Sequence, residues 1–174
     1  MKSVKDLLEK YVIDDYGHVQ VPEDINDRNE LGKALFGASL IHALDFWLND
    51  ANDLIENPQP AEPYLRKNEA YRIDKSFRET LSTLSEEQKN IIKKLIQRTA
   101  TGLLFNILVD LDQFDYGQIK MQIKPKQLDN SETELNVLPT KFQIHDELNE
   151  WIFYLSKYSN ELVEKVEGGY ELKN

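Results

Sequence analysis

The sequence contains no cysteine, so it forms no disulfide and offers no thiolate metal ligand or cysteine nucleophile. Long apolar runs are also missing. The first fifteen residues hold no apolar segment of signal-peptide length, and no segment approaches the roughly 20 apolar residues of a transmembrane helix. We therefore expect a soluble protein of the cytoplasm.

Basic residues are few relative to acidic ones. The chain has 21 Lys and Arg against 31 Asp and Glu, a net charge of −10. Such a charge repels phosphate backbones and anionic lipid, so we expect neither nucleic-acid nor membrane binding. Two interpretations stay open: the acidity keeps the protein soluble, or it attracts and orients a basic protein partner.

Motifs of known chemistry are absent from the sequence. It has no P-loop, no Gly-x-Gly-x-x-Gly, no Gly-x-Ser-x-Gly and no His-Glu-x-x-His, and only three histidines. No catalytic residue can be assigned, and no cofactor is expected. An enzyme is therefore the less favoured interpretation.

At 174 residues, the chain is expected to form a single α-rich globular domain over 1–174. Its main feature is the segment 85–112, which opens with Ser85 and Gln88 at capping-box spacing. From Leu103 to Leu111 the segment is almost wholly apolar. A helix that is apolar on most sides is usually buried, so 85–112 is predicted to be the central helix.

The remaining elements follow from hydrophobic periodicity and turn residues. We expect helices at 3–11, 27–56, 73–84 and 144–166, an antiparallel hairpin at 117–138, and a short strand at 18–21. Two glycines within 27–56, Gly32 and Gly37, are explained by close helix crossing. The predicted fold class is α+β, predominantly α, with helices around 85–112 and a small antiparallel β-hairpin.

The segment 144–166 carries apolar residues in alternating steps of four and three, and Gly168-Gly169 follows it as a helix stop. This stripe is typical either of packing onto the domain or of a coiled-coil seam. A homodimer through helix 144–166 is therefore an open alternative. The stripe consists of Ile144, Leu148, Trp151, Leu155, Tyr158, Leu162 and Val166.

Acidic residues gather at the predicted C-terminal end of helix 85–112, where the helix dipole favours cations. A bound basic partner would explain them, as would a position beyond the last helical turn. Tyrosine and tryptophan beside carboxylates are typical of an interface with a lysine-rich surface. The predicted binding residues are Asp110, Asp112, Asp115, Tyr116, Trp151 and Tyr154.

A metal site is the alternative. His42 and Asp45 stand three residues apart in a predicted helix, so both could ligate one divalent ion. The acids from Asp110 to Asp115 would supply further ligands. On this interpretation, the protein is a metal-assisted or acid–base enzyme.

The stretch from Leu84-Ser85-Glu86-Glu87-Gln88 to Leu108-Val109-Asp110-Leu111-Asp112, followed by the strand Ile119 to Ile123, resembles small uncharacterised cytoplasmic proteins of bacteria. Some proteins of this size and acidity are similar to immunity proteins, which bind and neutralise a cognate toxin. The resemblance implies a non-catalytic interaction module, of the immunity type or a regulatory partner of a basic protein. It implies no particular functional residue.

Overall fold

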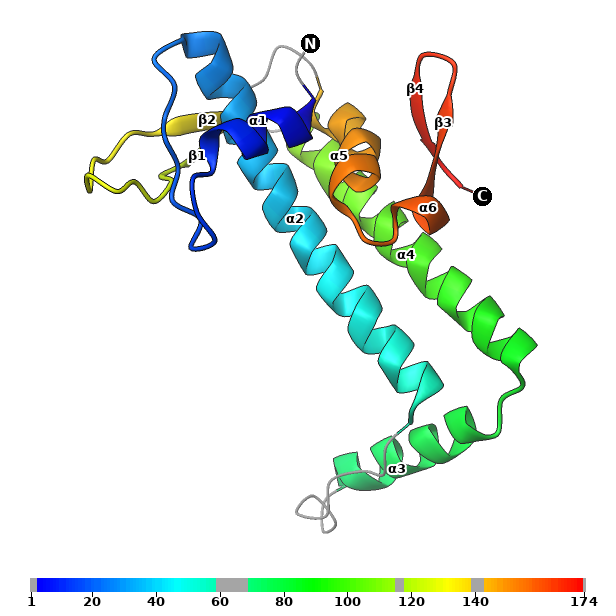
Figure 1. Ribbon diagram of the computed structural model, residues 1–174. Helices are drawn as coiled ribbons and strands as arrows, with labels where there is room; N and C mark the ends of the chain where they lie inside the picture. The colour runs from blue at the N-terminus through cyan, green and yellow to red at the C-terminus, as the bar shows by residue number, and fades with distance from the viewer. Residues whose placement is uncertain (1–2, 59–68, 115–117, 139–142, 174) are drawn as a thin grey trace. The chain divides into compact units, whose positions relative to one another are not determined.

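The computed structural model describes residues 3–58, 69–114, 118–138 and 143–173, and within these ranges the chain is predominantly helical (Figure 1). Its first four elements are helices: α1 (Val4–Tyr11), α2 (Ile25–Glu56), α3 (Glu69–Ser82) and α4 (Glu86–Asp112). Short elements follow: β1 (Met121–Ile123), β2 (Leu135–Leu138), the 3₁₀ helix η2 (Ile144–Glu147), α5 (Leu148–Leu155), α6 (Ser159–Leu162), β3 (Val163–Val166) and β4 (Gly169–Leu172).

Two of the helices begin at capping boxes. At α1, the backbone N–H of Asp6 donates to the Ser3 hydroxyl (3.2 Å), and the Ser3 N–H donates to the Asp6 carboxylate (3.0 Å). At α4, Gln88 N–H donates to Ser85 Oγ (3.2 Å), and Ser85 N–H donates to Gln88 Oε1 (2.9 Å). Each pair satisfies donors that helix formation leaves free, and the predicted start of α4 is confirmed.

The chain divides into two compact units. Unit 1 comprises residues 1–43 and 101–174, and unit 2 comprises residues 44–100. The boundaries fall within helices α2 and α4. The first part of α2 and the last part of α4 belong to unit 1, and the remainder of each helix belongs to unit 2. The units are described separately below.

Unit 1 holds the larger buried core. Strand β2, η2 and α5 supply most of it, together with the first half of α2. Its side chains that are at most 1% exposed are Leu31, Ile41, Leu108, Leu135, Val137, Ile144, Leu148, Trp151 and Ile152.

The two glycines of α2 lie in unit 1 where other chain segments come close. A Cβ on Gly37 would stand 2.4 Å from Trp151 Cδ2 in α5, and one on Gly32 would stand 2.3 Å from the Asn136 carbonyl oxygen in β2. No larger residue fits without movement. The expectation of a close helix crossing is confirmed at Gly37, whereas Gly32 contacts a strand.

Unit 2 has a thinner core. Its buried apolar side chains are Leu44, Leu48, Ile55 and Leu81. The end of α2 is joined to α4 by Glu56, which pairs with Lys89 (3.6 Å) and Lys93. The hydrogen bond from Lys93, followed by the nearby lysine charges, holds the pKa of Glu56 below its ordinary value.

The prediction that 85–112 is the central buried helix is wrong. Within α4, Ile91, Leu95 and Leu103 are 60–62% exposed and Ile107 is 47% exposed. The buried residues of α4 are Gln97, Thr101 and Leu108. These three residues lie along one side of the helix, so an apolar composition on most sides does not produce burial on most sides.

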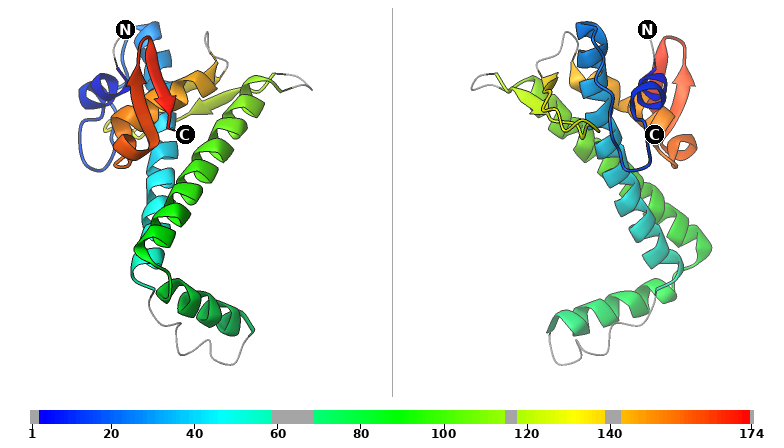
Figure 2. Two further views of the ribbon diagram at one scale, coloured as in Figure 1. Left: turned by 90° about the vertical axis from the view of Figure 1, so that its right-hand side faces the viewer. Right: turned by 60° about the vertical axis from the view of Figure 1, so that its left-hand side comes forward.

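The prediction of one continuous helix over 144–166 is wrong. Helix α5 ends at Leu155, where Ser156 takes an extended conformation (φ −80°, ψ 138°), and only the short α6 follows before the chain becomes a strand. Val163–Val166 then pairs antiparallel with Gly169–Leu172, and Gly168 occupies the two-residue turn with φ +95°. Both views of Figure 2 place this β3–β4 hairpin beside α5, in agreement with the contacts between them. The seam required by the predicted homodimer is therefore not formed.

The predicted hairpin at 117–138 is confirmed in its paired part. Ile123 faces Leu135 and Met121 faces Leu138 in antiparallel register, with an irregularity between Met121 and Gln122. The strand expected at 18–21 is reduced to one bridge between Val12 and Val19. The Val19 N–H donates instead to the Lys126 carbonyl (2.7 Å).

Candidate binding surface

Asp112 serves the fold directly. Its carboxylate accepts the backbone N–H groups of Ile144 (2.9 Å) and His145 (3.0 Å) at the start of η2. The Nδ1 atom of His145 lies 2.6 Å from the same carboxylate, and the two side chains are 11% and 7% exposed. A carboxylate stabilises free N–H groups at a helix start, so this acid is placed to hold η2 against α4.

Two of the predicted aromatic binding residues are also engaged within unit 1. Trp151 is 1% exposed and meets Phe36 edge to face at 6.1 Å, so it offers no surface for a partner. The Tyr154 hydroxyl accepts a bond from Tyr170 (2.9 Å), and Phe153 stacks on the Tyr170 ring at 4.2 Å. These rings attach the β3–β4 hairpin to α5.

Asp110 is exposed on α4, whereas the predicted Asp115 and Tyr116 lie outside the described residues. Asp110 stands among exposed apolar side chains. Leu103 is 61% exposed, Ile107 is 47% exposed, and Phe114, two residues beyond the helix, is 46% exposed. Leu103, Ile107, Asp110 and Phe114 are called the α4 stripe below.

The α4 stripe lies in a stretch without positive charge. No Lys or Arg occurs between Arg98 and Lys120, while the same stretch contains three aspartates. The first half of α4 differs sharply. There, Ile91 (60%) and Leu95 (62%) are as exposed as Leu103, but each has a basic residue three positions on along the same side of the helix, Lys94 and Arg98.

The charge of the two units follows the same division. Unit 1 carries 21 acidic and 12 basic residues, a net charge of −9, and unit 2 carries 10 and 9, a net charge of −1. Almost all of the chain's net charge therefore lies in unit 1. A partner approaching unit 1 meets an acidic surface, and one approaching unit 2 meets a nearly neutral one.

Sequence reasoning missed one charged cluster, centred on Lys33. This lysine is 5% exposed, and its ammonium lies 2.9 Å from Glu30 and 3.0 Å from Glu147. Burial alone would lower the pKa of Lys33, but the bonds to the two carboxylates raise it. Glu30 stands three residues before Lys33, so the sequence could have predicted this ion pair. Glu147 is 114 positions away, and no local pattern in the sequence indicates that it contacts Lys33.

Glu150 borders the Lys33 cluster. Burial, and then the charge of Glu147, raise the pKa of the Glu150 carboxyl, against a hydrogen bond from the Val4 N–H. The space beside these side chains is about 20 Å³, room for about one water molecule. This space leaves no room for a ligand larger than a water molecule.

The metal alternative finds no support in the geometry. His42 is exposed on α2 and Asp45 is 6% exposed, so the two side chains meet different surroundings. Among the described residues, no group of three or more His, Asp or Glu side chains is arranged to hold a metal ion.

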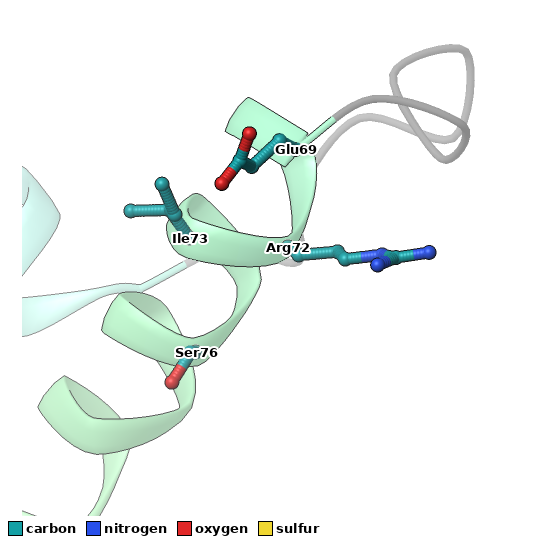
Figure 3. Close-up of a pocket in the computed structure, with 4 residues that line it drawn as sticks. All are labelled: Glu69, Arg72, Ile73 and Ser76. Atoms are coloured by element: carbon teal, nitrogen blue, oxygen red, sulfur yellow. The ribbon is translucent and has the colours of Figure 1, made fainter.

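A shallow hollow of about 580 Å³ lies on α3 of unit 2 (Figure 3). Its described lining is Glu69, Arg72, Ile73 and Ser76. Figure 3 shows Arg72 pointing away from Glu69 and Ile73. A ligand site needs polar groups that point toward a common centre, and these do not, so we assign no function to this open hollow.

Within the described ranges, no helix is both long enough and apolar enough to cross a membrane. The chain matches no protein family model, no curated protein and no solved structure.

Proposed function

We propose that this chain is a non-catalytic interaction module that binds a basic protein through unit 1, as an immunity-type or regulatory partner. The observation that carries the proposal is the separation of charge: unit 1 has a net charge of −9 and unit 2 a net charge of −1. Acidity needed only for solubility would not have to collect in one unit.

A concentrated negative field accelerates and orients the encounter with a positive surface. Its range in solution is set by screening, about 10 Å at 0.1 M salt. Binding should therefore be strong at low ionic strength and weaken steeply as salt is added. Apolar contacts would add affinity that salt does not remove.

The test is affinity capture in which the tagged chain is used to bind proteins from an extract of its own host at low salt. The capture is repeated at about 0.5 M salt, and the bound proteins are identified by mass spectrometry. The expected result is a basic protein in stoichiometric amount that is retained at low salt and shed at high salt. If the low-salt capture contains no basic protein, and co-expression with neighbouring gene products gives no complex, the proposal is wrong.

Matched charge variants locate the effect. Three exposed glutamates of unit 1, Glu164, Glu167 and Glu171, are changed to Gln in one variant. Three exposed acids of unit 2, Asp50, Glu79 and Glu87, are changed to their amides in the control. Retention at low salt should fall further for the unit 1 variant. Equal losses would contradict a role for the charge separation.

A further inference from the structure

We infer that the basic partner docks on the α4 stripe, and that it presents an amphipathic helix with apolar residues on one face and lysine or arginine beside them. This inference rests on the proposed function and adds the place of binding and the form of the partner. The stripe is Leu103, Ile107, Asp110 and Phe114, as defined above.

The first support is geometric. Leu103, Ile107 and Asp110 are separated by four and three residues, which places them along one side of α4. The two apolar members on the helix are 61% and 47% exposed, and Phe114, two residues beyond the helix end, is 46% exposed. An amphipathic helix commonly binds through apolar residues at this spacing.

The second support is electrostatic. Asp110 is exposed within the stripe, and no basic residue occurs between Arg98 and Lys120. The C-terminal end of α4 at Asp112 adds the negative end of the helix dipole. A helix face with exposed apolar side chains and the Asp110 carboxylate complements a partner with apolar and positive side chains.

The same charges disfavour a second copy of this chain as the occupant. Two stripes packed on each other would place two Asp110 carboxylates and two negative helix ends in one interface with no positive charge from the stripe to balance them, which is unfavourable. The first half of α4 provides a comparison. Ile91 and Leu95 match the spacing and exposure of the stripe, but Lys94 and Arg98 beside them would repel a basic helix.

The experiment uses the full chain and a fluorescein-labelled synthetic helix built from Leu and Lys in an amphipathic pattern. A peptide with the same lysine content and Ser in place of Leu serves as the charge-only probe. In the stripe variant, Leu103→Gln and Ile107→Gln are combined. The matched control combines Ile91→Gln and Leu95→Gln. Glutamine keeps helix propensity, and circular dichroism verifies the fold of both.

The expected result, by fluorescence anisotropy, is about tenfold or greater weakening of Leu/Lys peptide binding in the stripe variant. The control variant should bind as the unchanged protein does. The charge-only probe should bind all three proteins with equal, weak affinity. Asp110→Asn should lower the salt sensitivity of Leu/Lys binding, whereas Asp50→Asn should not.

Failures of the two proposals are distinguishable. If the Leu/Lys peptide binds the stripe variant and the unchanged protein equally, the docking site is wrong while the proposed function stands. If neither cationic peptide binds at low salt and the capture is also empty, the proposed function fails. If sedimentation finds a dimer that the stripe variant abolishes, the occupant is a second copy and the inference is overturned.

Discussion

The two tryptophans of the chain lie in opposite surroundings. Trp151 in unit 1 is 1% exposed and packs on Gly37, whereas Trp47 in unit 2 is 66% exposed and meets the ring of Phe46, which is 58% exposed, at a centroid distance of 5.5 Å. The contrast extends to the units themselves. Unit 1 combines a large core with a net charge of −9, and unit 2 combines a small core with a net charge of −1.

This difference separates two uses of apolar residues. Unit 1 buries seventeen apolar side chains, which stabilise its fold, whereas unit 2 buries four. In unit 2, six large apolar side chains are at least half exposed: Phe46, Trp47, Ile73, Phe77, Ile91 and Leu95. Because burial of apolar area is the main source of stability, substitutions should cost far more in unit 1.

The sharpest test exchanges each tryptophan for alanine. Trp151→Ala should lower the free energy of unfolding by about 3–5 kcal/mol, since it removes a fully buried ring. Trp47→Ala should change it by no more than about 0.5 kcal/mol. Urea unfolding measures both, and equal losses would break the comparison. In addition, the blue-shifted part of the tryptophan emission should disappear in the Trp151 variant only.

The Lys33 cluster predicts the next largest effect. Lys33→Met leaves Glu30 and Glu147 without the cation that they share and should cost about 3 kcal/mol at neutral pH. Because the folded pKa of Lys33 is raised above 10.5, its stabilisation is complete below that pH and is lost as pH rises through the folded pKa. The variant should lack this high-pH decline in urea midpoints.

An equivalent change in unit 2 provides the control. Lys93→Met removes an ion pair in which the Lys93 side chain is 20% exposed and the Glu56 side chain is 37% exposed. Pairs in contact with water contribute little, so the loss should be clearly smaller than for Lys33→Met. If Lys93→Met lowered the free energy of unfolding more than Lys33→Met does, ion pairs and not the buried core would be the main source of stability in unit 2.

Two glycines test where packing in unit 1 is tight. Gly37→Ala should destabilise by about 1–3 kcal/mol, because the new methyl group meets the Trp151 ring. Gly102→Ala should stabilise by about 0.5–1 kcal/mol, because nothing lies within 4 Å of its Cβ position in α4. Thermal unfolding of the two variants should shift in opposite directions; a shared direction would contradict the assigned contacts.

The smallest expected effect concerns pH. The pKa of Glu150 is raised above its ordinary 4.5, so the folded state holds this proton more tightly than the unfolded state. The contribution of Glu150 to stability therefore falls as pH rises from 4.5 to the folded pKa. Glu150→Gln should remove this decline while its amide oxygen still accepts the Val4 N–H. Urea midpoints measured from pH 4 to pH 8 provide the comparison, and parallel curves would refute the assignment.

Local signals in the sequence predicted the helices that they govern. The capping box at Ser85 and Gln88 predicted the start of α4. In α2, the apolar residues at helical spacing are buried: Leu31, Ala34, Ile41, Leu44, Leu48 and Ile55. These succeeded because a cap and a helical row depend on residues only a few positions apart. The predominantly helical class with a small hairpin was likewise predictable.

The failures arose where a pattern has two structural solutions. The four-and-three spacing of 144–166 is typical of one helix, but Val163 and Val166 with the turn at Gly168 also suit a hairpin. Of the predicted binding residues, Asp110 is the one described residue that lies exposed within an apolar surface. Asp112 and Trp151 have partners far along the chain, which no local pattern reveals.

The bonds of Asp112 to the start of η2 have a consequence for chain length. They join positions 32 residues apart, so the two ends of the segment between Asp112 and Ile144, which contains the β1–β2 hairpin, are held next to each other as in a closed loop. Doubling the length of such a closed segment costs only about 0.6 kcal/mol. The exposed turn at Asp129–Ser131 is therefore a place where a reporter domain could be inserted while both ends stay secured.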